Sequence, residues 1–215
     1  SDKPKKEAFH TFDGHRQVLL EWIERLDLQR CVLVVQDWGG ILGLTLPMAA
    51  PGRFGGLLAM NTLLATGEQP LSAGFLAWRE MCAQKPLFGV GRMLARGNPQ
   101  LSEAECAAYD APFPDAGYRA ALRAFPLLVP GSLGAPGAAL SRAARDFWAS
   151  QWTGRSLMFV GAQDPVLGGP TMDALRAHIR GCPPPMVVAE GGHFVQEWGG
   201  PIAAAALAHF GLPAA

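Results

Sequence analysis

Residues 31–46 read CVLVVQDWGGILGLTL, and this stretch decides the fold. Its first part, from Cys31 to Val35, is apolar and rich in β-branched side chains, which is typical of a strand buried on both faces of a parallel sheet. The apolar run ends at Asp37, and two glycines follow before a second apolar segment that has helical spacing. We interpret the stretch as a strand, a sharp turn that carries Asp37, and a helix.

The rest of the chain continues this alternation of strands and helices. Short apolar runs predict strands at 31–36, 56–60, 156–161 and 186–189. Between residues 63 and 152 the pattern indicates only helical pieces, broken by proline and glycine. The sequence therefore predicts an α/β fold, with a mostly parallel sheet flanked by helices and a helical insertion. We expect an α/β core formed by residues 1–62 and 153–215, and a helical cap domain formed by residues 63–152.

The composition excludes several classes of protein. Eighteen Lys and Arg residues balance 18 Asp and Glu residues, which argues against the basic surface that nucleic-acid binding needs. Hydrophobic residues make up 49% of the chain, enough for a packed core, yet no apolar run approaches the ~20 residues of a membrane span. The first residues contain no apolar segment typical of a secretory signal. We therefore expect a cytoplasmic protein that binds neither nucleic acid nor membrane.

Three polar residues, Asp37, Asp164 and His193, each follow a predicted strand, at the edge where parallel sheets bind ligands. Taken alone, Asp37 could be only the N-cap of the next helix, and His193 could be a structural histidine. A carboxylate beside a histidine fixes the tautomer of the ring, so that the other nitrogen can take a proton from water. We predict a nucleophile at Asp37 and an acid–base pair of Asp164 and His193. Since the histidines show no metal-ligand spacing, no metal site is expected.

Three motifs carry a resemblance to a known family: VVQDWGGILGLTLPM at 34–48, AYDAPFPD at 108–115 and EGGHFVQE at 190–197. They closely resemble haloalkane dehalogenases of the α/β-hydrolase superfamily, whose chain order of nucleophile, acid and histidine also matches. The chain resembles most the subfamily that holds a halide between two tryptophans. Position by position, the resemblance implies a nucleophile, an acid, a base and two halide-binding residues: Asp37, Asp164, His193, Trp38 and Trp78.

The resemblance also implies the ligands of the protein. The expected partner is a small halogenated substrate, no cofactor is needed, and a halide ion is expected only as a product ligand. Five further residues match positions that line the substrate cavity in that subfamily: Phe75, Phe125, Pro126, Val129 and Val166.

The chemistry gives a reason for each of these residue types. A carboxylate can displace halide from a saturated carbon in one step, leaving an ester on Asp37, if the carbon is held near attack distance. The departing halide needs hydrogen-bond donors but no proton, and an indole N–H only donates. Water activated by the His193–Asp164 pair then releases an alcohol. We expect hydrolytic dehalogenation of short haloalkanes.

The chain also departs from the family pattern. By comparison it lacks about the first four strands, together with a His-Gly loop that supplies a second oxyanion donor. A sheet interrupted in its middle exposes the edge of the 31–36 strand, so we expect a dimer or a complementing N-terminal segment. The segment between Asn61 and Trp78 also looks shorter than in the subfamily.

Two other functions stay open at this point. An epoxide hydrolase would share the aspartate nucleophile, but it needs a pair of cap tyrosines to protonate the opening ring. The chain has only Tyr109 and Tyr118, and Tyr109 lies in the dehalogenase-like motif AYDAPFPD. The two tryptophans at halide positions favour dehalogenation. A truncated, inactive dehalogenase homologue is the non-enzymatic alternative. A serine esterase is disfavoured, because aspartate stands where that enzyme has serine.

Overall fold

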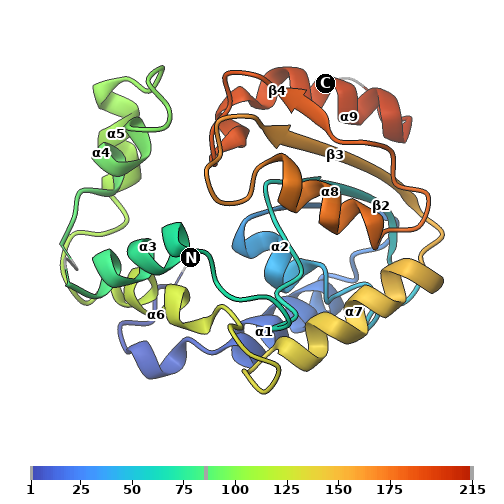
Figure 1. Cartoon of the computed structure of the whole chain (residues 1–215), viewed down its shortest axis with the longest axis horizontal. Coiled ribbons are helices and arrows are strands. Elements are labelled where there is room, and N and C mark those ends of the chain that lie inside the picture. Colours follow the sequence, from blue (N-terminus) through green and yellow to red (C-terminus); the bar gives the residue numbers. More distant parts are fainter. Residues whose placement is uncertain (1, 85–86, 214–215) are drawn as a thin grey trace.

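The computed structural model describes residues 2–84 and 87–213 (Figure 1). Within these residues the strands form one parallel sheet in the order β1-β2-β3-β4. The predicted α/β fold is confirmed, and the strand ends differ from the prediction by one or two residues because chain ends of strands carry the weakest apolar signal. The strands are β1 (Cys31–Gln36), β2 (Phe54–Met60), β3 (Arg155–Gly161) and β4 (Met186–Val188).

Helices precede, connect and follow these strands. They are α1 (Phe12–Arg25), α2 (Trp38–Gly43), α3 (Ala73–Gln84), α4 (Val90–Ala95), α5 (Glu103–Asp110), α6 (Ala120–Leu128), α7 (Ala138–Ser150), α8 (Gly169–Ala177) and α9 (Gly199–Phe210), with 3₁₀ turns η1 (Glu7–Phe9) and η2 (Val195–Trp198). Helix α4 has only six residues, too few to show a helical period in the sequence. None of the helices of residues 2–84 and 87–213 is long and apolar enough to cross a membrane.

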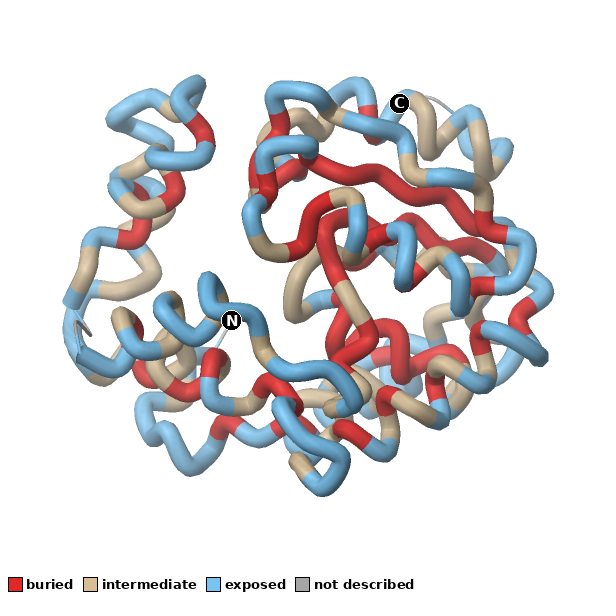
Figure 2. Tube along the Cα trace, in the orientation of Figure 1, coloured by how far each residue is buried: buried red, intermediate tan, exposed pale blue. Residues whose placement is uncertain are grey.

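The sheet buries both of its faces, as alternation along β2 shows. Leu57 and Ala59 pack in one cluster with residues of α7 and α8, whereas Leu58 and Met60 pack in a second cluster with residues of α9. Successive side chains of a strand point to opposite faces, so one strand serves both clusters. Figure 2 shows the central strands as a nearly continuous buried band. This explains why β2 and β3 read as uninterrupted apolar runs.

β1 is less covered than its neighbours. Val35 is buried in the cluster with α7 and α8, but Val34, on the opposite face, is 57% exposed. Among the described residues β1 pairs only with β2, so one edge of the strand is open.

The helices between β2 and β3 fall into two groups. In Figure 1, α3, α4, α5 and α6 lie beside the carboxyl ends of the strands, with α4 and α5 farthest from the sheet. Helix α7 instead packs on the sheet, because Ala144 and Trp148 belong to the buried cluster that contains Val35, and the Trp148 indole donates to the carbonyl of Leu44 at 2.8 Å. The division into a core and a cap at residues 63–152 stays a prediction.

Candidate active site

Asp37 lies in a strained turn between β1 and α2. Its backbone has φ 47° and ψ −122°, a region that non-glycine residues rarely occupy and that costs on the order of 1–3 kcal/mol. Four hydrogen bonds hold the turn. The Asp37 N–H donates to the carbonyl of Asn61 (3.1 Å), and the Asp37 carbonyl accepts from the N–H groups of Gly40 (2.9 Å) and Ile41 (3.2 Å) and from the Thr62 hydroxyl (2.7 Å). The carboxylate is thereby presented at the rim of the sheet.

Two glycines allow α2 to approach the sheet this closely. A Cβ at Gly40 would lie 1.9 Å from Oγ1 of Thr62, and a Cβ at Gly43 would lie 2.8 Å from a methyl group of Val35. Gly40 and Gly43 therefore have a steric reason, since only a hydrogen fits between the helix and its neighbours at these two positions.

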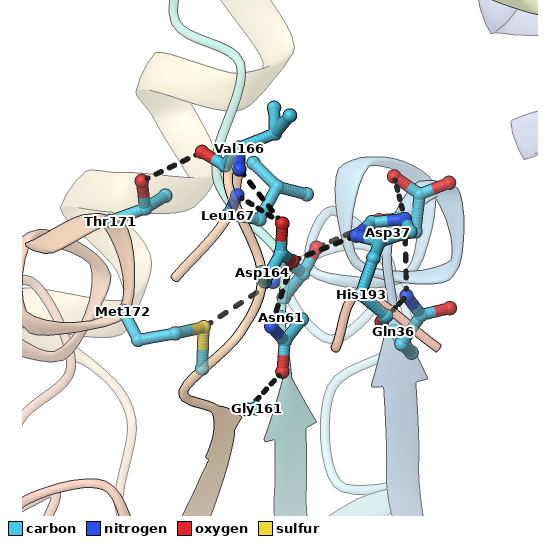
Figure 3. Close-up of polar contacts among 11 residues, drawn as sticks. Gln36, Asp37, Asn61, Gly161, Asp164, Val166, Leu167, Thr171, Met172 and His193 are labelled. Atoms are coloured by element: carbon cyan, nitrogen blue, oxygen red, sulfur yellow. Dashed lines mark hydrogen bonds and ion pairs between the residues drawn. The ribbon is translucent and has the colours of Figure 1, made fainter. Parts of the chain in front are cut away.

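The structure brings together the three polar residues that follow β1, β3 and β4. Figure 3 shows the ring of His193 between the two carboxylates: Nδ1 lies 2.8 Å from Oδ2 of Asp164, and Nε2 lies 3.6 Å from Oδ1 of Asp37. The Asp164 side chain is fully buried, whereas those of Asp37 and His193 are partly exposed. A substrate can therefore reach Asp37 while Asp164 stays shielded from water.

Asp164 is held as an anion. Its Oδ1 accepts the backbone N–H groups of Val166 (2.8 Å) and Leu167 (3.0 Å). Burial alone would raise the pKa of Asp164, but the hydrogen bond and charge of His193 and these two N–H donors outweigh it, and they lower the pKa to about 2. The carboxylate therefore accepts the Nδ1 proton of His193 and fixes the ring.

His193 is held as a cation by the same contacts. Burial alone would lower the pKa of His193, but the hydrogen bonds and charges of Asp164 and Asp37 outweigh it and raise the pKa to about 9. The ring is therefore protonated at neutral pH as long as Asp37 carries its negative charge.

Two residues that the sequence prediction missed complete this network. Asn61, fully buried at the end of β2, donates its amide to Oδ2 of Asp164 (2.8 Å) and accepts the N–H of Gly161 (2.9 Å). The amide of Gln36 donates to the carbonyl of His193 at 3.0 Å. The signal that singled out Asp37, a polar residue at the carboxyl end of a parallel strand, could have found both of them.

The two tryptophans lie in different surroundings. Trp38, the first residue of α2, packs edge-on against Phe125, with ring centroids 4.9 Å apart. Trp78, on α3, packs against Phe88 at 5.8 Å. Among the described residues the two indoles do not form an aromatic pair with each other.

Most of the residues predicted to line a cavity gather around Trp38. Phe75 and Val129 belong to the same apolar cluster as Trp38. Val166 comes two residues after Asp164. A methyl group of Val166 faces α3, since it would lie 3.8 Å from a Cβ added at Gly74. Pro126 is buried inside α6 beside Phe125.

No metal centre accompanies this site in the described part of the chain, where no three His, Cys, Asp or Glu side chains cluster in a way that could hold an ion.

At the carboxyl edge of the parallel sheet, Asp37 stands on a strained strand–helix turn and faces the His193–Asp164 pair. This fold and site are those of an α/β hydrolase. The model of the alpha/beta hydrolase fold matches residues 1–200. Curated relatives narrow this class, and the chain belongs to the haloalkane dehalogenase family.

Two relatives and one solved structure document this membership. The haloalkane dehalogenase of Psychrobacter cryohalolentis is 37% identical over 98% of this chain and 70% of the relative. That of Mycolicibacterium paratuberculosis is 36% identical over 94% of this chain and 67% of the relative. The tetrameric haloalkane dehalogenase DpaA of Paraglaciecola agarilytica superposes with a TM-score of 0.94 at 39% identity, over 98% of this chain and 70% of DpaA.

Proposed function

We propose that this protein hydrolyses the carbon–halogen bond of short haloalkanes to an alcohol and a halide ion, through an ester on Asp37. The single observation that carries the proposal is the position of His193, which reaches toward Oδ1 of Asp37 (3.6 Å) while Asp164 holds its other nitrogen (2.8 Å). The names of the related enzymes support the same reaction class.

In the first step the Asp37 carboxylate attacks the carbon that carries the halogen. A carbon–oxygen bond forms, the carbon–halogen bond breaks, and the halide leaves with the bonding electron pair. We propose that the indole N–H groups of Trp38 and Trp78 stabilise the departing halide, since they donate hydrogen bonds and transfer no proton. Phe75, Phe125, Pro126, Val129 and Val166 are proposed to line the substrate cavity.

In the second step water attacks the ester carbonyl. His193 takes a proton from that water and passes it to the alcohol oxygen as the ester bond breaks. Ester formation removes the negative charge of Asp37, which is one cause of the raised pKa of His193, so the ring loses its proton more easily at this stage. As the first residue of α2, Trp38 has a backbone N–H that the helix cannot satisfy, and we propose that it binds the oxyanion. The second proton of the water leaves to solvent as the Asp37 carboxylate is restored, so the two steps balance without a cofactor.

Epoxide hydrolysis is less well supported. The hydroxyl of Tyr109 donates to Glu197, and the ring of Tyr118 lies under the ammonium group of Lys5, 3.9 Å from its centroid. The Tyr109 hydroxyl is therefore engaged by Glu197, which counts against a role of this tyrosine in protonating an opening epoxide ring.

The proposal is tested by bromide release from 1,2-dibromoethane, with wild-type protein and Asp37→Asn compared under the same conditions. The variant keeps the size of the side chain but lacks the nucleophile. We expect release by the wild type and none by Asp37→Asn. Folded wild-type protein that releases no bromide, or equal release by both, overturns the proposal.

A further inference from the structure

A hydrogen bond outside the site joins α5, which with α4 lies farthest from the sheet (Figure 1), to the segment that follows His193. The hydroxyl of Tyr109, on α5, donates to Oε1 of Glu197, in η2. Figure 1 shows α4 and α5 standing apart from the sheet, opposite the ends of β3 and β4. Among the described residues Glu197 has no salt-bridge partner, so this bond is its main polar tie.

Helix α5, which carries Tyr109, packs closely against α4. Asp110, the next residue, accepts the first N–H groups of α4, from Val90 (2.6 Å) and Gly91 (3.2 Å). A Cβ at Gly91 would lie only 2.1 Å from the carbonyl oxygen of Cys106, so the two helices touch backbone to backbone. Tyr109 therefore stands on a closely packed pair of helices.

The segment around His193 is held differently on its two sides. Before His193, the carbonyl of Gly191 accepts the N–H of Gln163 at 2.8 Å, which ties the turn to the end of β3. After His193, Val195 is fully buried against the sheet, and Glu197 binds Tyr109. The α4–α5 segment therefore reaches the turn on both sides of His193: a Cβ at Gly192 would lie 3.2 Å from the carbonyl oxygen of Gly97, just after α4, and a side-chain hydrogen bond joins Tyr109 to Glu197.

We propose that Tyr109 and Glu197 are a positioning pair that keeps Nε2 of His193 directed at Asp37. The inference rests on the proposed function, because it concerns the step in which His193 activates water. Asp37 itself is held by the turn between β1 and α2, which makes no use of this bond. Loss of the bond should therefore slow hydrolysis of the ester and leave displacement of the halide unchanged. Hydrogen bonding to Glu197 raises the pKa of Tyr109 to about 12, so the phenol remains a donor at any assay pH below that value.

The test uses Tyr109→Phe, which removes only the hydroxyl, with Tyr118→Phe as the matched control. Rapid mixing with excess 1,2-dibromoethane follows bromide release, and intact-protein mass spectrometry follows the ester. For Tyr109→Phe we expect a first burst of bromide at the wild-type rate, a steady state lower by about 10- to 100-fold, and accumulated ester, because small displacements of a catalytic group have effects of this size. Glu197→Gln keeps an oxygen acceptor and should stay close to wild type.

Each other outcome decides against the proposal. Equal slowing of burst and steady state by Tyr109→Phe would indicate a merely structural role, and wild-type kinetics would show that the bond is not needed. If Tyr109→Phe does not fold, Glu197→Leu and Glu197→Gln make the same comparison.

A wild-type protein without bromide release overturns the proposed function, and the positioning pair is then tested by NMR titration of the His193 ring. Tyr109→Phe should lower the pKa of His193 from about 9 toward its ordinary value, and Tyr118→Phe should not. Equal pKa values in all three proteins overturn the inference.

Discussion

Asn61 donates its side-chain amide to Oδ2 of Asp164 at 2.8 Å, and the same oxygen binds Nδ1 of His193 at 2.8 Å. The carbonyl oxygen of the Asn61 side chain in turn accepts the N–H of Gly161, at the end of β3. One buried amide therefore links the ends of β2 and β3 and sets the direction in which Asp164 points. Its left-handed backbone, with φ 31°, is one that asparagine adopts more readily than most residues.

Replacement of Asn61 should therefore be costly. Asn61→Ala leaves the N–H of Gly161 and one lone pair of Asp164 without partners, and each such buried group costs about 1–3 kcal/mol. We expect the free energy of unfolding to fall by about 2–4 kcal/mol in urea denaturation. Asn98→Ala is the control, because Asn98 is equally buried but makes a single hydrogen bond and its Oδ1 has no partner in the described residues. Equal losses in the two variants would contradict this account.

The turn at Asp37 should tolerate a methyl group at one glycine but not at the next. Gly40→Ala forces a Cβ to within 1.9 Å of Thr62, and relief requires α2 to move away from β2. We expect a loss of stability of about 1–3 kcal/mol, the usual cost of overpacking, measured by thermal melting. At Gly39 nothing lies within 4 Å of the added Cβ, so Gly39→Ala should melt at or slightly above the wild-type temperature. A Gly40→Ala protein as stable as Gly39→Ala would refute the steric argument.

The pKa of His193 should depend on the charge of Asp37. Asp37→Asn removes one of the two carboxylates that raise this pKa, so we expect the value to fall from about 9 toward 6.5 while the Asp164 contact keeps it above 6.5. NMR titration of the His193 ring resonances in the wild type and in Asp37→Asn measures this directly. An unchanged pKa in the variant would mean that Asp37 does not act on the ring.

The stability of the protein should depend on pH through the same ion pair. The pKa of His193 is raised when the chain folds, so protonation of this ring stabilises the folded state. This contribution to the free energy of unfolding is complete below pH 6.5 and is lost as the pH rises to about 9. This contribution is on the order of 3 kcal/mol. The pKa of Asp164 is lowered on folding, so the acid side of the profile should decline from about pH 3.8 to about pH 2. Urea denaturation across pH should show a flatter alkaline side for His193→Gln than for His178→Gln.

The indole N–H groups should matter more than the aromatic rings that carry them. Trp38→Phe and Trp78→Phe keep an aromatic side chain but remove the donor, and loss of one such donor commonly lowers turnover by about 100-fold. Bromide release from 1,2-dibromoethane measures the effect. Trp22→Phe is the control, since Trp22 is 54% exposed on α1. A Trp78→Phe protein with full activity would show that Trp78, which packs on Phe88, takes no part in halide binding.

The strands, their parallel direction and the turn at Asp37 could be predicted because their signals are local. Each strand is a mainly apolar run, and the glycines that let α2 approach the sheet, Gly40 and Gly43, stand only three and six residues after Asp37. The positions of Asp164 and His193 follow from the same rule, since residues after parallel strands meet at one edge of the sheet. The bounds of α4 could not be predicted, because six residues are too few to show a helical period.

The tertiary structure alone decided which side chains meet. Asn61 contacts Asp164 across more than a hundred residues of chain, Tyr109 binds Glu197, and Trp38 packs on Phe125 while Trp78 packs on Phe88. Nothing in the local sequence distinguishes Asn61 from a residue that merely ends a strand. Burial and turn preferences act between neighbours in the chain, whereas hydrogen bonds of this kind depend on the packing of whole elements, which brings distant side chains to within 3 Å of each other.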